Sequence, residues 1–300
     1  MNRTLDYIPP QFLSREPYRN AAQNATVSLL SGSVANPFYN LVPGVNLGTA
    51  STVALSQLLM PYPQFTGVTE QAVNDGSSYY HSLNLRLQRR YSQGLTVQAN
   101  FAYSKLIDQT TRLNSFDPSP EKSLDSIDRP QRGSVVASYE LPVGKGKPFA
   151  SSAPPVVNQI IGGWVINATF TKQSGAVLSW GNVIYLGGPV DVHPRDIYHT
   201  FNTSVFDTNS ADQLTNNIRT FPTTFANLRA CGTDNVDASM IKNFTLHERL
   251  RLQFRAEFFN ALNHPQFSAP NLSPTSSTFG TITGQGNNTR EIQFALRLLW

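Results

Sequence analysis

Several kinds of residue are scarce in this 300-residue chain, and each scarcity excludes a class of protein or site. Cys231 is the only cysteine, which excludes an intramolecular disulfide and a cysteine zinc site. No run approaches the 18 apolar residues of a spanning helix, and the first residues lack the charged and then apolar order of a signal peptide. Charged residues make up 14% of the chain, against roughly 25% in a typical soluble domain. A membrane role would therefore have to be carried by strands.

The residues that are present argue against a disordered or nucleic-acid-binding chain. Hydrophobic residues make up 40% and aromatic residues 11%, so the chain has enough apolar surface to fold. The net charge is +4, but the basic residues are spread without a block of five or six. We therefore expect no nucleic-acid partner.

Seven segments alternate apolar and polar residues with a period of two, which is typical of β-strands. In the last segment one side is apolar and ends in an aromatic residue: Ile292, Phe294, Leu296, Leu298 and Trp300. The other six segments are 83–88, 95–104, 134–141, 164–171, 236–243 and 250–258. Segment 236–243 is the least regular, because Ile241 and Lys242 break the alternation. Residues 245–258 also have the spacing of a capped amphipathic helix, but a helix would turn Leu252 toward the charged side. The sequence predicts an all-β, antiparallel fold.

The connections between these strands alternate in length. Tight turns are expected at 92–94 and 246–248, and a medium Pro-, Gly- and Lys-rich turn at 142–162. Long polar loops are expected at 105–132, 175–234 and 261–287. Three such loops are uncommon in a compact soluble domain, whereas bacterial outer-membrane barrels have short periplasmic turns and long outer loops. If Trp300 ends at the periplasmic face, all three long loops lie outside.

In a membrane barrel the two sides of each strand meet different surroundings. Strands of about eleven residues, tilted near 45°, rise about 26 Å, close to the apolar band of an outer-membrane barrel. Ionic side chains are costly in lipid, so we expect five of them to face the lumen: Arg86, Arg251, Arg255, Glu257 and Arg297. Arg255 and Glu257 are expected to pair with each other across strands, or else to contact a passing solute. Aromatic residues near strand ends suit the membrane interface: Tyr79, Tyr80, Tyr91, Tyr103, Trp164, Phe258 and Trp300.

No arrangement of residues predicts catalysis, a cofactor or a metal. Asp191, His193, Asp196 and His199 match no standard metal spacing and are interpreted as a solvated loop. Glu121, Asp125 and Asp128 are interpreted as part of a polar outer loop. The Gly-Lys repeat at 144–147 lacks a P-loop frame and predicts a basic periplasmic turn, and the His-Pro pair at 264–265 predicts a structural turn.

The chain resembles the C-terminal barrel of TonB-dependent outer-membrane receptors, in particular the Oar-like branch common in acidobacteria. The resemblance covers nearly the whole chain and is carried by YPQFTGV (62–68), YYHSLNLRLQRRYSQGL (79–95), FAYSKLID (101–108), LQFRAEFFNALNHPQF (252–267) and the final strand. It implies a 22-stranded barrel, and recognition of the segment from Ile292 to Trp300 by the barrel-assembly machinery. It also implies outer-membrane lipid as a partner, and coupling to the TonB system through a plug.

Neither the plug nor the coupling motif of that family is recognisable in this sequence. We therefore expect a C-terminal fragment in which residues 1–78 form an extracellular loop region without convincing strands, and residues 79–300 form the last strands of the barrel. Such a fragment would have two unpaired sheet edges. The expected function is solute uptake by the full-length parent. The alternatives are a passive pore or surface adhesin on the same barrel, and a soluble secreted β-rich carbohydrate-binding or hydrolytic domain.

Overall fold

A computed structural model describes residues 2–44, 46–65, 67–247 and 250–300. Its main feature is an eight-stranded antiparallel sheet, in which seven long strands follow one another in chain order. These strands are β5 (Ser77–Ser92), β6 (Leu95–Gln109), β8 (Gln131–Glu140), β9 (Trp164–Gln173), β12 (Thr233–His247), β13 (Leu250–Phe259) and β14 (Glu291–Leu299). The eighth strand, β7 (Ser123–Leu124), pairs with β6. All seven predicted strands are confirmed, including the strand rather than helix at β13.

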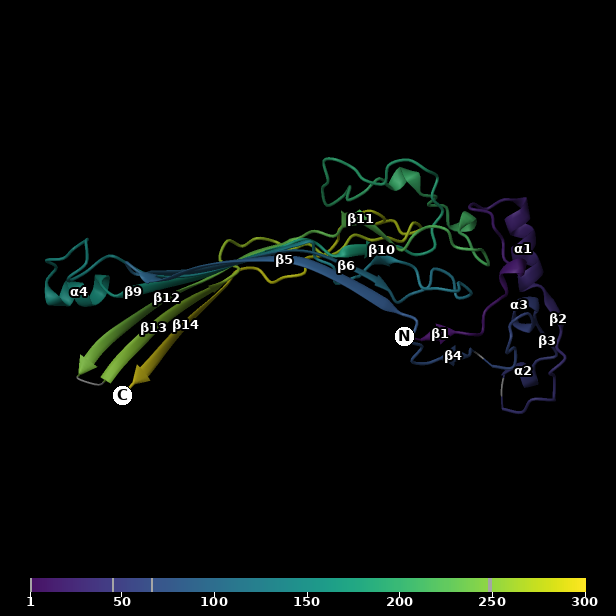
Figure 1. Ribbon diagram of the computed structural model, residues 1–300, viewed down its shortest axis with the longest axis horizontal. Coiled ribbons are helices and arrows are strands. Elements are labelled where there is room, and N and C mark those ends of the chain that lie inside the picture. The colour runs from purple at the N-terminus through teal and green to yellow at the C-terminus, as the bar shows by residue number, and fades with distance from the viewer. Residues whose placement is uncertain (1, 45, 66, 248–249) are drawn as a thin grey trace.

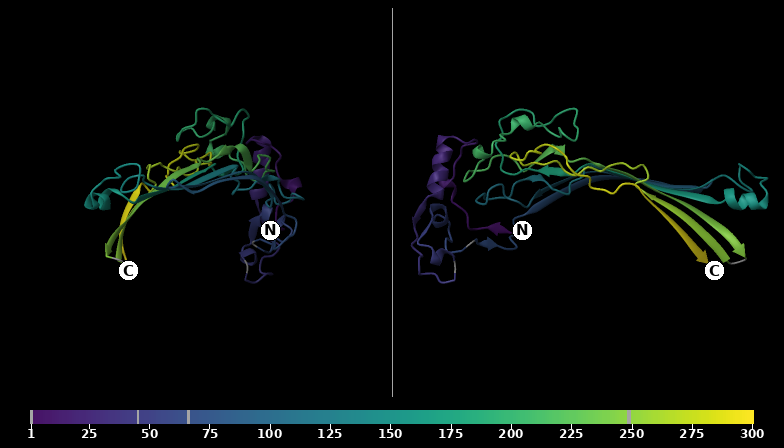
Figure 2. Two further views of the ribbon diagram at one scale, coloured as in Figure 1. Left: turned by 60° about the vertical axis from the view of Figure 1, so that its left-hand side comes forward. Right: turned by 180° about the vertical axis from the view of Figure 1, so that it is seen from behind.

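The sheet is open. Among the described residues, β5 and β14 pair with a neighbouring strand on one side only, so the sheet has the two free edges that were expected. Figure 2 shows the strands bent into a twisted arch. Among the described residues, none of the helices has the length and apolar character that spanning a bilayer requires.

The two ends of the sheet differ in their connections. One end carries the long connections β6–β8, β9–β12 and β13–β14, and we call it the long-loop end; the opposite short-turn end carries the other connections and the C-terminus (Figure 1). This is the predicted division. At the short-turn end, β5 and β6 are joined through Gln93 (φ 54°) and Gly94 (φ 84°), and paired positive φ angles are required in a two-residue type I′ hairpin. A Cβ on Gly94 would lie 2.9 Å from the Glu140 carbonyl oxygen, so glycine is needed there.

Some predicted boundaries were wrong. β6 continues to Gln109, five residues into the segment predicted to be a loop, and β12 continues to His247. Leu246 and His247 of the tight turn predicted at 246–248 are therefore strand residues, and its Glu248 lies outside the described residues. The strands β5, β6 and β12 are 15 or 16 residues long, which corresponds to roughly 50 Å, longer than the apolar band of an outer-membrane barrel.

The loops and the N-terminal region contain further elements. The prediction that residues 1–78 lack strands was wrong, because short strands are present there. They are β1 (Arg3–Thr4), β2 (Ser33–Ala35), β3 (Thr52–Ala54) and β4 (Thr69–Glu70), accompanied by a 3₁₀ helix (Pro10–Phe12), α1 (Ala21–Ser31), α2 (Asn46–Thr49) and α3 (Leu55–Leu58). The β8–β9 connection adds α4 (Pro155–Ile161). The long β9–β12 loop adds β10 (Val177–Ser179), β11 (Thr224–Arg229) and 3₁₀ helices at Thr203–Val205 and Ser210–Asp212. Asn20 starts α1 by accepting a hydrogen bond from the Gln23 amide, as an N-cap does.

Candidate functional site

One face of the main sheet is apolar across all seven long strands. The register places Leu85 opposite Phe101, Val135 opposite Phe170, and Phe254 opposite Leu296. Little protein covers this face, since Leu296 is 70% exposed and Phe294 is 68% exposed. Ala256 is the only hydrophobic residue of these strands that is buried among the described residues. The apolar side chains are therefore not packed together as they would be in a β-sandwich.

The opposite face is polar and carries all five ionic residues predicted to face a lumen: Arg86, Arg251, Arg255, Glu257 and Arg297. The Arg86 guanidinium donates to the side chains of Gln88 and Gln98. Arg255 Nη1 lies 3.3 Å from Glu257 Oε1. The pairing expected across strands instead runs along one strand, because residues two apart in a strand point to the same face. A pocket of about 170 Å³ beside Glu257 opens on the same face.

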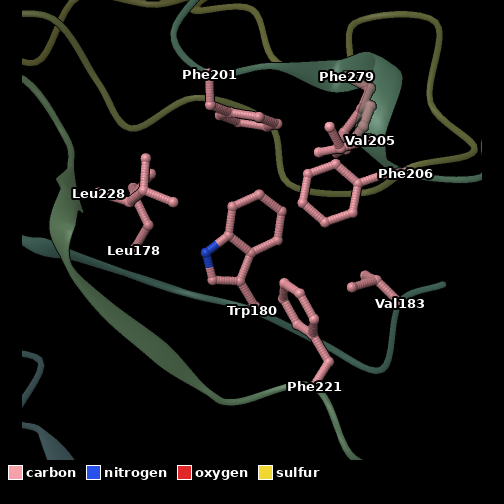
Figure 3. Close-up of a cluster of buried hydrophobic side chains, with 9 residues drawn as sticks. All are labelled: Leu178, Trp180, Val183, Phe201, Val205, Phe206, Phe221, Leu228 and Phe279. Carbon is pink, nitrogen blue, oxygen red and sulfur yellow. The ribbon is translucent and has the colours of Figure 1, made fainter. Parts of the chain in front are cut away.

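At the long-loop end the loops enclose an aromatic core that the sequence reading missed (Figure 3). Trp180 is 2% exposed and stacks on Phe206 with ring centroids 4.9 Å apart. It also makes edge contacts with Phe201 and Phe221 at 5.0 and 5.8 Å. The remaining members of this core are Leu178, Val183, Val205, Leu228 and Phe279. Phe279 comes from the β13–β14 loop. The segment 175–234, predicted to be a polar loop, therefore has a hydrophobic core of its own.

Buried polar contacts join the β6–β8 loop to this core. Asp128 is 2% exposed; its carboxylate lies 2.5 Å from Arg229 Nη2 of β11 and accepts a hydrogen bond from the Leu106 amide. The Glu121 carboxylate accepts a hydrogen bond of 2.6 Å from the Thr223 hydroxyl. Asp128, interpreted as part of a polar outer loop, does lie in the β6–β8 loop, but it is buried there and its charge is compensated inside the protein. We call the three long loops together the cap.

Arg219 makes hydrogen bonds that join two of the loops of the cap. Its guanidinium donates to the carbonyl oxygens of Trp180 (2.7 Å) and Phe221 (3.0 Å). Its backbone amide donates to the side chain of Asn114 in the β6–β8 loop. Burial lowers the pKa of Arg219, which still remains a cation at neutral pH because the ordinary arginine pKa is so high.

The N-terminal region docks on the cap, and a pocket of about 340 Å³ lies beside this contact. Ser14 exchanges backbone hydrogen bonds with residues 216 and 218, and the Gln23 side chain donates to the Thr215 carbonyl oxygen. Figure 1 shows α1 at the same end of the molecule as the cap. The pocket is lined by aromatic rings, amide side chains and a proline, among them Tyr185, Phe221, Phe225, Asn182, Asn217 and Pro17.

The acids and histidines of segment 191–199 form exposed local pairs. Asp191 is bound by Arg195, which lowers its pKa, and lies 3.2 Å from His193 Nε2. Backbone amides of Tyr198 and His199 lower the pKa of Asp196, and its carboxylate lies 3.2 Å from His199 Nδ1. Among the described residues no group of three metal-ligating side chains converges.

The turn predicted around His264 is present. Asn260, at φ 48°, accepts a hydrogen bond from the His264 amide and donates one to its carbonyl oxygen. Asn260 also donates to the Asn288 carbonyl oxygen, which joins the two ends of the β13–β14 loop. His264 thus takes part in shaping this connection.

The predicted aromatic residues lie toward both ends of the strands. Tyr91, Trp164 and Trp300 lie at the short-turn end, and Trp300 follows the last residue of β14. The others lie toward the long-loop end: Tyr79, Tyr80, Tyr103 and Phe258. Their positions along the strands are those of two girdles, one at each membrane interface. Tyr80 is an exception, because it shares the polar face of β5 with Arg86.

A family model described as an outer membrane beta barrel domain matches residues 16–293. The chain belongs to this family. No significant match was found among curated proteins or solved structures. Membership places the barrel domain in the outer membrane, where the uncovered apolar face meets lipid. The alternative of a soluble secreted domain was therefore wrong.

Membership of this family also explains why one face of the sheet is apolar and the other is polar. Hydrocarbon surrounds the apolar face, so that face needs no protein cover. Ionic side chains such as Arg86 and Arg297 are then kept on the other face, away from lipid.

The aromatic core had one sequence signal that could have located it: the density of aromatic residues from Trp180 to Phe225 in a segment without strand alternation.

Proposed function

We propose that this barrel domain is the C-terminal portion of a TonB-dependent, Oar-like outer-membrane receptor that takes up a solute. The observation that carries the proposal is the cap. Long barrel loops without a core would be mobile, whereas these share an aromatic core, a buried Asp128–Arg229 pair and a pocket. An ordered binding surface avoids the entropic cost of ordering loops when a ligand binds.

The orientation follows from the connections. Outer-membrane barrels have short turns on the periplasmic side and long loops outside, so the cap faces the exterior. The polar face then lines the barrel interior, and its Arg255 and Glu257 lie along the path of an entering solute. The segment from Ile292 to Trp300 is proposed as the signal read by the barrel-assembly machinery. Coupling to the TonB system requires a plug, which the full-length parent would supply.

The cap pocket suits an uncharged solute that has both an apolar face and hydrogen-bonding groups. Its aromatic side chains offer flat apolar surface, while Asn182 and Asn217 offer amide donors and acceptors. The two amides already pair with each other at 2.8 Å, and a ligand could exchange that bond for its own. The domain itself is proposed to bind and conduct, with no catalytic step.

Uptake in cells tests this proposal. A panel of labelled solutes is supplied to cells that make the parent receptor with Tyr185→Ala in the pocket, or with the control Tyr198→Ala. Tyr198 lies in the same loop but is exposed and lines no part of the pocket. We expect at least one solute to require TonB for entry and to be lost only in the Tyr185 variant. Entry that persists without TonB would favour a passive pore, and cell attachment without uptake would favour an adhesin.

A further inference from the structure

A second pocket, of about 310 Å³, lies at the short-turn end of the sheet, opposite the end that carries the cap. Three lysines line it, and one carboxylate is present: Lys145, Lys147, Lys242 and Glu140. The pocket is lined by residues of the ends of β8 and β12, of the 142–162 connection and of α4. Figure 1 shows α4 beside the short-turn end of β9. Nothing in the proposed uptake of solute uses this pocket.

Lys242 is the unusual member, because it lies on the apolar face of the sheet. The register places it between Trp164 of β9 and Phe254 of β13. Its side chain is 4% exposed, and its ammonium donates to the Gly162 carbonyl oxygen and lies 5.3 Å from the ring centre of Phe244. None of the ion pairs of the described residues involves Lys242. A buried cation without a counter-ion is costly, so this position calls for an anion.

The single carboxylate of the pocket is already engaged. Lys147 Nζ lies 2.8 Å from Glu140 Oε1, and the Glu140 carboxylate raises the pKa of Lys147. The Tyr91 hydroxyl donates to the other oxygen of Glu140 at 2.8 Å. Two positive charges, on Lys145 and Lys242, are therefore left over in the pocket. The loop that carries Lys145 is held against α4, since the Lys145 amide donates to the Asn158 side chain at 2.6 Å.

An apolar surface continues from this pocket. The exposed face of α4 carries Val156, Val157 and Ile160. Trp164 donates from its indole nitrogen to the Ile160 carbonyl oxygen at 2.9 Å, which fixes α4 beside the lipid-facing side of β9. A ligand that satisfies both features has an anionic group and long apolar chains. Inorganic phosphate alone would leave the α4 surface exposed.

We propose that this pocket binds the phosphate of an anionic phospholipid of the inner leaflet, with the acyl chains against α4 and Trp164. The proposal rests on the orientation given above, which puts the short-turn end at the periplasmic face. Lys242 and Lys145 supply the two charges that meet the phosphate. Basic pockets beside an interfacial tryptophan suit such headgroups because the lysines extend toward the interface while their stems stay in apolar surroundings.

The test compares two lipids with identical acyl chains, phosphatidylglycerol and phosphatidylcholine. The full chain is held in detergent micelles, and lipid binding is measured by native mass spectrometry. The variants are Lys242→Gln and Lys145→Gln, with Lys172→Gln as the control, because Lys172 is exposed and lies near the other end of β9. We expect wild type to prefer phosphatidylglycerol, each pocket variant to bind it about fivefold more weakly, and the control to bind as wild type does.

Equal binding of the two lipids by wild type, or unchanged binding in both pocket variants, would overturn the proposal. Displacement of the lipid by excess inorganic phosphate would show a free-phosphate site and overturn the lipid assignment. Lys145 lies in an exposed turn, so its variant carries the test if Lys242→Gln does not fold, as judged by circular dichroism. Flotation of the chain with phosphatidylcholine vesicles is measured separately. Failure to insert there contradicts the proposed function, whereas loss of lipid preference contradicts only this inference.

Discussion

Replacing Trp180 by alanine should open the cap while leaving the sheet intact. Trp180 is almost fully buried and contacts three phenylalanine rings at centroid distances of 4.9 to 5.8 Å. Removing a large aromatic side chain from a core costs about 3 to 5 kcal/mol. The indole nitrogen has no hydrogen-bond partner among the described residues, so its removal also relieves a penalty of about 1 to 3 kcal/mol. We therefore expect the lower end of the range, about 3 kcal/mol, or a roughly hundredfold rise in cap opening.

Amide hydrogen exchange of the chain in detergent micelles measures this effect. The informative amides are those of Leu186 and Asn202, which donate to cap carbonyl oxygens at 2.7 and 2.8 Å. Their exchange should rise about a hundredfold in the variant, while amides in the middle of β9 and β12 stay protected. Trp180→Phe is the matched control, because it keeps an aromatic ring and removes the unpaired donor. It should cost less than about 1.5 kcal/mol.

Two results would refute this reasoning. Unchanged exchange of the cap amides in Trp180→Ala would mean that the aromatic core does not hold the cap. An equal rise in the cap and in β9 and β12 would mean that the cap and the sheet unfold as one unit. In the second case the cap could not have its own stability.

Three further perturbations test other parts of the structure. Asp128→Asn should destabilise the cap by about 3 kcal/mol, because Arg229 loses its buried partner, whereas Asp125→Asn should cost little, because Asp125 is only half-buried and takes part in none of the ion pairs of the described residues; both are checked by proteolysis of the cap. Leu296→Arg on the apolar face should weaken folding into vesicles by about 2 to 4 kcal/mol, while Ala295→Arg on the polar face should not, as denaturant titration of inserted protein would show. The pKa of Asp196 is lowered in the folded protein, so its carboxylate contributes stability above about pH 4, and this contribution is lost as the pH falls through the lowered pKa. Amide hydrogen exchange in segment 191–199 should therefore rise in acid, and this rise should be absent in Asp196→Asn.

The strands were predictable because their signal is local. Alternation with a period of two places Leu83, Leu85 and Leu87 on one side whatever the partner strand is, and the register then joins such sides across the sheet. The break at Ile241 and Lys242 made the fifth strand irregular in the sequence. The structure gives the reason: the strand continues unbroken, with Ile241 on the polar face and Lys242 on the apolar face.

The cap was not predictable in the same way. Trp180, Phe201, Phe206 and Phe221 have no common period, and they meet only after the loop between β9 and β12 has folded back on itself. Asp128 and Arg229 are 101 residues apart, so their pairing carries no local signal. The extension of β6 to Gln109 pairs with β5, whose Ser77 lies opposite Gln109, and β7 pairs with Ile107 and Asp108 on the other side. Such contacts are tertiary, and a chain read segment by segment does not contain them.

The sheet and the cap therefore remove their apolar side chains from water in different ways. The sheet leaves residues such as Phe294 and Leu296 exposed, so its apolar face gains stability only when lipid covers it. The cap projects into water, where no lipid is available, and it has to bury its aromatic residues within the protein. The binding surface that we propose in the cap can then keep its shape independently of the lipid around the strands. That independence is what a receptor needs if its ligand arrives from the aqueous side.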